Sequence, residues 1–178
     1  MKTQRETKIV DQRTNFYWDR LRKYGKQYKH FNWPSTELVL NLVYTRDILR
    51  SHFLQVLTGF NLSISAMNIL MILKHGESKG CAQQELSSLL LVSRANITKV
   101  IDGLEKRGLI ARTSSKEDRR TRVIKLTEAG EDLADRVIPC QNEETVRVTV
   151  GLTRNEISLL SKLLAKFRES IVEGGKVK

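Results

Sequence analysis

The sequence predicts a mostly α-helical fold that carries one small β-hairpin, and three observations lead to this expectation. Apolar residues recur at helical spacing through most of the 178 residues. Two short helical segments follow each other closely within 83–107, and two β-rich segments flank a charged loop within 109–126. Polar starts and glycine stops bound most of these segments. Hydrophobic residues make up 40% of the chain and charged residues 29%, so an ordinary globular core is expected.

Residues 1–33 differ from the rest of the chain in charge and in aromatic content. They hold nine basic and three acidic residues, a net of +6 out of the total of +11, and seven of the eleven aromatic residues. An apolar stripe predicts an amphipathic helix from about residue 14 to 31, with Gly25 as a weak point. The apolar face favours packing on the protein itself, while the basic face leaves DNA or a membrane surface open as partners.

A long helix is expected from Pro34 to about Gly59, because the run Pro-Ser-Thr-Glu restarts the chain there. Its apolar stripe is wider than a surface helix needs, which indicates contact with a second chain as well as with the core. A helix from about Ser63 to His75 follows, and Gly76 ends it.

Two short helices and a hairpin come next. The helices are expected over 83–90 and 93–107, and Gly108 stands where a left-handed helix stop is common. The strands are expected over 109–113 and 122–126, since these segments alternate or carry β-branched residues around a polar tip.

The remainder of the chain is expected to be helical. Thr127 caps a helix that runs to about Val150 and is interrupted or kinked at Pro139. Thr153 and Glu156 form a capping box, which opens the last helix. The apolar stripe of that helix comprises Ile157, Leu160, Leu164, Phe167 and Ile171.

The order of helix, tight turn, helix and charged hairpin within 63–126 is the layout of a winged helix-turn-helix, which reads DNA with its second helix. Four apolar residues of that helix are expected to pack on the domain: Ile97, Val100, Ile101 and Leu104. The residues expected to contact DNA are Arg94, Ala95, Asn96, Thr98, Lys99, Arg112, Asp118, Arg119 and Arg120. The formal net charge of +11 favours a polyanionic partner of this kind.

The chemistry of these side chains suggests their roles. Asn96 can pair with adenine, and Lys99 with guanine or a phosphate. The methyl groups of Ala95 and Thr98 can touch thymine methyl groups. Two further residues are better placed for phosphates: Arg94 and Arg112.

At the tip of the hairpin, Arg120 is expected to enter the minor groove, where negative potential is concentrated. Asp118 lies two residues earlier and is expected to orient the Arg120 guanidinium. Arg119 is expected to contact a phosphate.

The segment from Ser93 to Ile110 resembles the recognition helix of the MarR family of bacterial transcriptional regulators. Asp118-Arg119-Arg120 and the segment from Val123 to Gly130 resemble that family's wing and the start of its next helix. The similarity spans roughly residues 34–172.

What the resemblance implies is a homodimer. Residues 34–60 and 127–174 would form the helical dimerisation base, 61–126 the DNA-binding lobe, and 1–33 an N-terminal extension. The partner would be double-stranded DNA with a near-palindromic operator. Regulators of this family are commonly repressors that a small molecule, often aromatic or anionic, releases from DNA by binding between base and lobes.

An effector pocket of this kind would draw on residues at helical spacing near the junction of base and lobe. These residues are Tyr44, Ile48, His52, Met67 and Met71. Ordinary core packing is the alternative explanation of the same residues.

Several classes of function lack support in the sequence. No GxGxxG turn, P-loop, GxSxG elbow or paired Cys/His is present, so no enzymatic activity and no cofactor are expected. The three histidines are not spaced as ligands, so no metal site is expected. No apolar run approaches the length of a membrane helix and no secretory signal is evident, which predicts a cytoplasmic protein without a membrane partner. Cys81 and Cys140 are expected to be packed thiols.

Two alternatives to a sequence-specific regulator remain open at this point. One is an architectural or nonspecific nucleic-acid-binding protein that uses the same fold and its basic extension. The other is an enzyme or small-molecule carrier that kept the dimer pocket and lost DNA binding, which the intact basic wing argues against.

Overall fold

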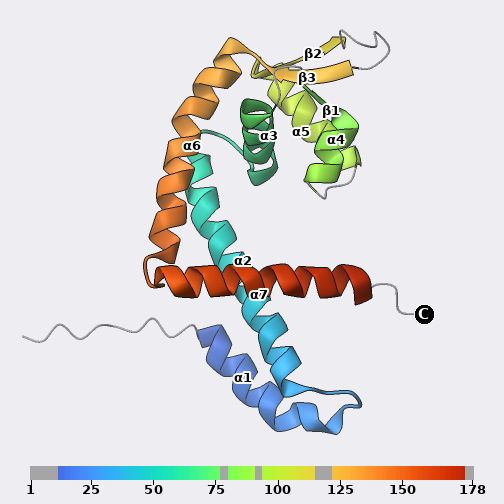
Figure 1. The fold of residues 1–178 in the computed structure, drawn as a ribbon, viewed down its shortest axis with the longest axis vertical. Coiled ribbons are helices and arrows are strands. Elements are labelled where there is room, and N and C mark those ends of the chain that lie inside the picture. The colour runs from blue at the N-terminus through green and yellow to red at the C-terminus, as the bar shows by residue number, and fades with distance from the viewer. Residues whose placement is uncertain (1–11, 77–79, 91–93, 115–121, 175–178) are drawn as a thin grey trace, which may run out of the picture. The chain divides into compact units, whose positions relative to one another are not determined.

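The computed structural model describes residues 12–76, 80–90, 94–114 and 122–174 (Figure 1). The chain divides into two compact units, Met1–Arg50 and Ser51–Lys178.

The first unit contains a helical hairpin. Helix α1 (Gln12–Tyr24) is followed by a 3-10 turn, η1 (Gly25–Gln27), and by the start of α2 (Trp33–Thr58). The prediction of one helix from 14 to 31 is therefore wrong about its end. The helix ends at the predicted weak point, Gly25, where the Phe31 ring packs so closely that an added Cβ would lie 2.3 Å from it.

Helix α2 confirms the long helix predicted before Gly59. Its first turn is capped by Asn32, whose side-chain Oδ1 accepts a hydrogen bond from the Ser35 N–H at 3.0 Å. Several large apolar side chains along α2 are exposed: Leu38, Val39, Leu42, Val43 and Ile48.

The second unit contains a lobe of three helices beside a small sheet (Figure 1). The helices are α3 (Ile64–His75), α4 (Gln83–Leu89) and α5 (Arg94–Lys106). The strands are β1 (Cys81–Ala82), β2 (Ile110–Ser114) and β3 (Arg122–Leu126), in the antiparallel order β1-β3-β2. Its largest fully buried side chains are Met67, Ile69, Leu70, Leu86, Ile97, Ile101, Leu104, Ile110, Ile124 and Val137.

The predicted helix boundaries and hairpin are confirmed to within about two residues. Ser63 caps α3 by accepting the Ala66 N–H at 3.1 Å, and Gly108 adopts the predicted left-handed conformation, with φ of 69°. Strand β1 was not predicted. It is only two residues long, with Cys81 opposite Ile124, and so short a segment carries no readable alternation.

Two long helices complete the second unit, α6 (Glu128–Thr149) and α7 (Arg154–Gly174). Helix α6 continues through Pro139, so of the two alternatives expected there an interruption is wrong, and a kink stays a prediction. A proline removes one hydrogen bond, which a long helix packed along its length tolerates. In α7 no residue is buried, although the helix carries a regular apolar stripe. None of the described helices is long and apolar enough to cross a membrane.

Candidate nucleic-acid interface

Helix α5 has one buried and one exposed face, and the division follows the predicted one. The buried side chains are Ile97, Ile101 and Leu104, with Val100 partly buried. The exposed residues include three predicted DNA contacts: Ala95, Asn96 and Lys99. Side chains that a folded lobe holds on the exposed face of one rigid helix are available to base edges in a major groove.

Thr98 lies at the edge between the two faces and is half-buried. Its hydroxyl accepts a hydrogen bond from Nε2 of Gln83 at 2.7 Å, which ties the start of α4 to α5. Thr98 therefore takes part in holding the two helices of the pair together. Arg94 is the first residue of α5, and its side chain lies outside the part of the chain that the structure describes.

Arg112 is held by two carboxylates of α5. Its guanidinium donates to Oδ1 of Asp102 at 2.5 Å and also to Glu105. The hydrogen bond with Asp102 is the main cause that raises the pKa of Arg112 above its ordinary value. These ion pairs join strand β2 to the helix whose exposed face would meet DNA.

The alternation of β2 explains why Arg112 faces the helix. Ile110 is fully buried, and residues two apart in a strand share a face, so Arg112 points toward the same side. Its partner in the antiparallel register is Ile124, which is also buried. The sequence predicts that Arg112 contacts a phosphate, whereas in the structure its guanidinium has two protein partners.

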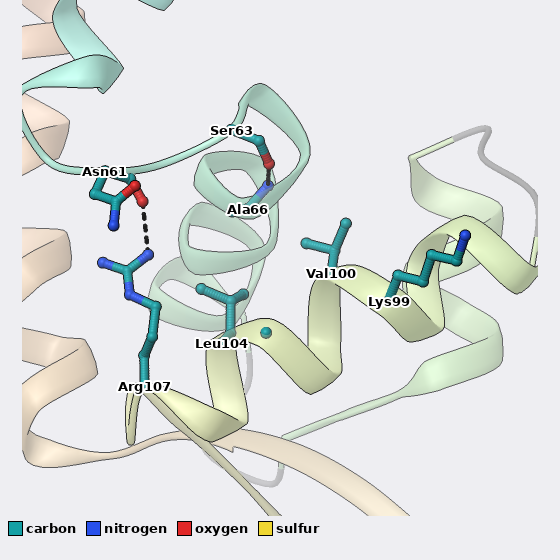
Figure 2. A pocket seen from close by; sticks show the side chains of 8 residues that line it. Asn61, Ser63, Ala66, Lys99, Val100, Leu104 and Arg107 are labelled. Atoms are coloured by element: carbon teal, nitrogen blue, oxygen red, sulfur yellow. Dashed lines mark hydrogen bonds between the residues drawn. The ribbon is translucent and has the colours of Figure 1, made fainter.

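Arg107 anchors the other end of α5. It donates to the backbone oxygens of Asn61 at 2.7 Å and Phe60 at 3.3 Å (Figure 2). A shallow, open hollow lies beside this contact, between the start of α3 and α5. Figure 2 shows Val100 and Leu104 pointing toward α3, while Lys99 extends toward the amino end of α5. The hollow thus lies at the packed edge of the helix.

The base of the hairpin is fixed by the start of α6. Thr127 Oγ1 donates to the Gly108 oxygen at 2.5 Å and accepts the Gly130 N–H at 3.1 Å. A Cβ added at Gly130 would lie 1.9 Å from the Leu109 oxygen, so only glycine permits this approach. The segment Leu126 to Gly130 therefore connects the end of strand β3 to the start of α6 and contacts the turn that follows α5. The predicted contacts Asp118, Arg119 and Arg120 lie outside the described residues.

The five residues predicted for an effector pocket have different environments. Tyr44 stands 5.8 Å from the ring of Trp18 between centroids, and Ile48 is exposed. In the second unit Met67 is buried in the core, with Met71 packed against it. His52 lies 3.0 Å from Glu144, measured from Nδ1 to Oε1. Whether these residues form one pocket stays a prediction.

Glu144 was not singled out from the sequence. Its carboxylate is buried on α6 and contacts both His52 and Arg147, the latter at 3.1 Å. Glu144 lies among other polar residues of α6, so the sequence alone does not show that its carboxylate is buried.

Both cysteines are free thiols. Burial, with a smaller contribution from Glu85, raises the pKa of Cys81 to about 12. A thiol with so high a pKa forms little thiolate near neutral pH, which makes Cys81 a poor redox sensor.

Comparisons with known proteins agree with this geometry. A model of the MarR family matches residues 62–121. The chain is 36% identical over 115 residues to the HTH-type transcriptional regulator PapX of Escherichia coli, and the match covers 62% of this chain and 70% of PapX.

Two solved structures show the same fold. One is the S. aureus MepR-DNA complex, with a TM-score of 0.66 and 19% identity, covering 79% of this chain and 99% of MepR. The other is CouR from Rhodococcus jostii RHA1 bound to p-coumaroyl-CoA, with a TM-score of 0.66 and 22% identity, covering 77% of this chain and 92% of CouR. They confirm the predicted fold class, a mostly helical chain with a small β wing.

Proposed function

The chain belongs to the MarR family of DNA-binding transcriptional regulators, and on that premise we propose that it is a homodimeric repressor that binds a near-palindromic operator and leaves it when a small molecule binds. Members of this family are regulators and not enzymes. In this proposal α5 reads the major groove, and the β2–β3 hairpin, here called the wing, contacts the neighbouring minor groove.

The observation that carries sequence-specific binding is the division of α5 into two faces. Ile97 and Ile101 are completely buried, while Asn96 and Lys99 stand exposed on the opposite side. Ala95, Asn96 and Lys99 are the side chains that we assign to base edges, with Arg94 assigned to a phosphate.

A binding titration tests this assignment. The full chain is titrated with the duplex recovered by footprinting beside its own gene and with a scrambled duplex of equal length. A specific regulator prefers the operator by about 10³ or more. Equal affinity for both duplexes would identify an architectural or nonspecific binder instead.

The dimer part of the proposal rests on exposed apolar residues that a monomer leaves in water. In α7 these are Ile157, Leu159, Leu160, Leu163, Ile171 and Val172. A contiguous apolar helix face of this kind marks a protein–protein contact. Two-fold pairing of chains would place two recognition helices about 34–36 Å apart, one turn of the duplex.

The wing assignments are part of the same proposal. Arg120 enters the narrow minor groove, Asp118 orients its guanidinium, and Arg119 contacts a phosphate. Arg120→Ala then weakens operator binding strongly, whereas Arg119→Ala weakens all DNA more evenly and lowers the salt slope by about one contact. Affinity is measured across a salt series together with thermal melts, and unchanged operator affinity in Arg120→Ala refutes the minor-groove role.

Release by an effector is supported by the presence of a CoA thioester on CouR, which shares this fold. We assign the effector to the region of His52, Met67 and Met71 in the second unit, and we expect the protein to act in the cytoplasm. Aromatic carboxylates and their thioesters are screened for a shift in melting temperature and for release of labelled operator. If no compound shifts the melting temperature or releases the operator, this class of effector is ruled out, whereas the proposal of DNA binding is unaffected.

A further inference from the structure

We propose that the basic face of the segment 12–29, which comprises α1, η1 and the two residues after η1, is a second DNA-binding surface that contacts duplex in addition to the base pairs read by α5. The proposal deepens the proposed function and rests on it for the operator. It concerns the first unit alone, and its evidence comes from that unit's own contacts and charges.

The aromatic side of α1 packs on α2. Trp18 Nε1 donates to Oε1 of Glu37 at 3.1 Å, and the Trp18 ring meets the Trp33 ring edge to face at 6.5 Å between centroids. Tyr17 and Trp18 also lie 6.0 Å and 5.8 Å from the Tyr44 ring. The extension is therefore a folded hairpin, and its other side is presented on a fixed scaffold.

That other side is strongly basic. The exposed cationic residues are Arg20, Arg22, Lys23, Lys26 and Lys29. Asp19 is the one acidic residue within 12–33. The Arg22 guanidinium lies 5.1 Å from the centre of the Trp33 ring, a contact that orders the side chain without cancelling its charge. Five exposed cations within residues 20–29 favour a partner with regularly spaced anions.

The exposed aromatic residues favour DNA over a lipid surface. Tyr24 and Tyr28 are exposed beside the cations, whereas Trp18, Leu21 and Phe31 are half-buried. A helix that binds a membrane surface inserts tryptophan, phenylalanine and leucine into the lipid. Here these side chains face the protein, and the outward side offers ammonium, guanidinium and phenol groups, which donate hydrogen bonds to phosphates.

The test neutralises this face and varies the length of the DNA. The full-length variant carries Lys23→Gln, Lys26→Gln and Lys29→Gln, which leaves the Trp18 and Arg22 contacts in place. A matched control carries Arg136→Gln, Lys162→Gln and Lys166→Gln, three exposed cations of α6 and α7. Affinity is measured across a salt series on a duplex with the operator alone and on one with about one and a half extra turns at each end, and thermal melts verify folding.

Wild type and control are expected to bind the longer duplex about tenfold more tightly than the operator alone. The variant with the three Lys→Gln changes at 23, 26 and 29, here called the hairpin variant, is expected to lose this gain. The slope of log K against log salt on the long duplex should fall by about 2 or more in the hairpin variant, since each phosphate contact contributes about 0.9. The same variant should match wild type on the short duplex.

Two outcomes overturn the proposal. Equal long-duplex affinity in wild type and hairpin variant refutes it, and an equal loss in the control variant attributes the effect to net charge. In a third experiment, binding of wild type and hairpin variant to vesicles of phosphatidylglycerol is measured. If the hairpin variant loses binding to the vesicles and keeps its affinity for DNA, the face binds a membrane and the proposal is wrong. Scrambled duplexes of both lengths separate this result from the proposed function, because flanking contacts do not depend on the operator sequence.

Discussion

Helices α5 and α7 both carry an apolar stripe, but they meet different surroundings within one chain. In α5 Ile97 and Ile101 have no exposed area, whereas in α7 Leu160 and Ile171 are 47% and 56% exposed. The lobe around α5 completes its core from local elements. The stripe on α7 stays exposed, and in the proposed dimer a second chain would cover it.

The free energy gained by burying apolar side chains explains why the difference between α5 and α7 matters. Full burial of one leucine or isoleucine side chain stabilises a protein by about 1.5–3 kcal/mol. In α5 that gain belongs to the folding of the lobe. In α7 it becomes available only when another surface covers the stripe, so it depends on protein concentration.

The largest effect should come from the core of the lobe. Ile101→Ala leaves a cavity beneath the recognition helix and should lower the free energy of unfolding by about 2–5 kcal/mol. The matched change on α7, Leu159→Ala, should cost much less in dilute solution, where that side chain already meets water. Chemical denaturation of both variants measures the contrast, and equal losses would contradict it.

A second prediction concerns the stripe itself. Leu160→Asp with Leu163→Asp should weaken dimerisation at least about a hundredfold, because two charges per chain would lie in a covered apolar seam. Sedimentation measures the dissociation constant, and operator affinity should fall with it. Ser158→Asp, on the opposite side of α7, is the control. A stable monomer of the wild-type chain at micromolar concentration would remove the basis of the comparison.

Local pattern was enough to predict much of α5 and its surroundings. The spacing of Ile97, Ile101 and Leu104 predicted the buried face, and Ser63 and Thr127 predicted helix starts, because each signal lies within a few residues of its effect. The same reasoning predicted the stripe on α7 and the hairpin that follows Gly108.

What the sequence could not predict depends on contacts between distant segments. The partners of Arg112 follow only once β2 is known to lie across α5, although the alternation from Ile110 could have shown which way the side chain points. The end of α1 depends on the Phe31 ring closing over Gly25. The role of Gly130 needs the Leu109 oxygen beside it.

A third prediction concerns Arg112, which joins strand β2 to α5. Arg112→Gln leaves Asp102 and Glu105 unpaired on the DNA-facing helix, which should repel phosphates and loosen the helix on β2. Operator affinity should fall about tenfold, equivalent to about 1.4 kcal/mol, and stability by on the order of 1 kcal/mol, since these ion pairs are partly exposed.

A triple variant distinguishes this positioning role from a direct phosphate contact. Asp102→Asn and Glu105→Gln, added to Arg112→Gln, remove the unpaired charges and should restore most of the affinity. A direct contact would instead leave the triple variant weak, with a salt slope lowered by about one in both variants. Affinity across a salt series, with melts as the folding control, decides between them.

The smallest effect is expected at the start of α7, where Glu156 Oε2 accepts the Thr153 N–H at 2.7 Å. This backbone hydrogen bond, with that of the Thr153 hydroxyl, lowers the pKa of Glu156 below its ordinary value of 4.5. Because the folded pKa is the lower one, the carboxylate stabilises the helix at and above pH 4.5 and loses this contribution as the pH falls through the folded value. Thermal melts of Glu156→Gln and wild type should therefore differ slightly at pH 7 and converge in acid, while Glu169→Gln, at the far end of α7, controls for the loss of one carboxylate. A difference that persists unchanged at pH 2 would show that the cap stabilises α7 through its shape and not through the charge of Glu156.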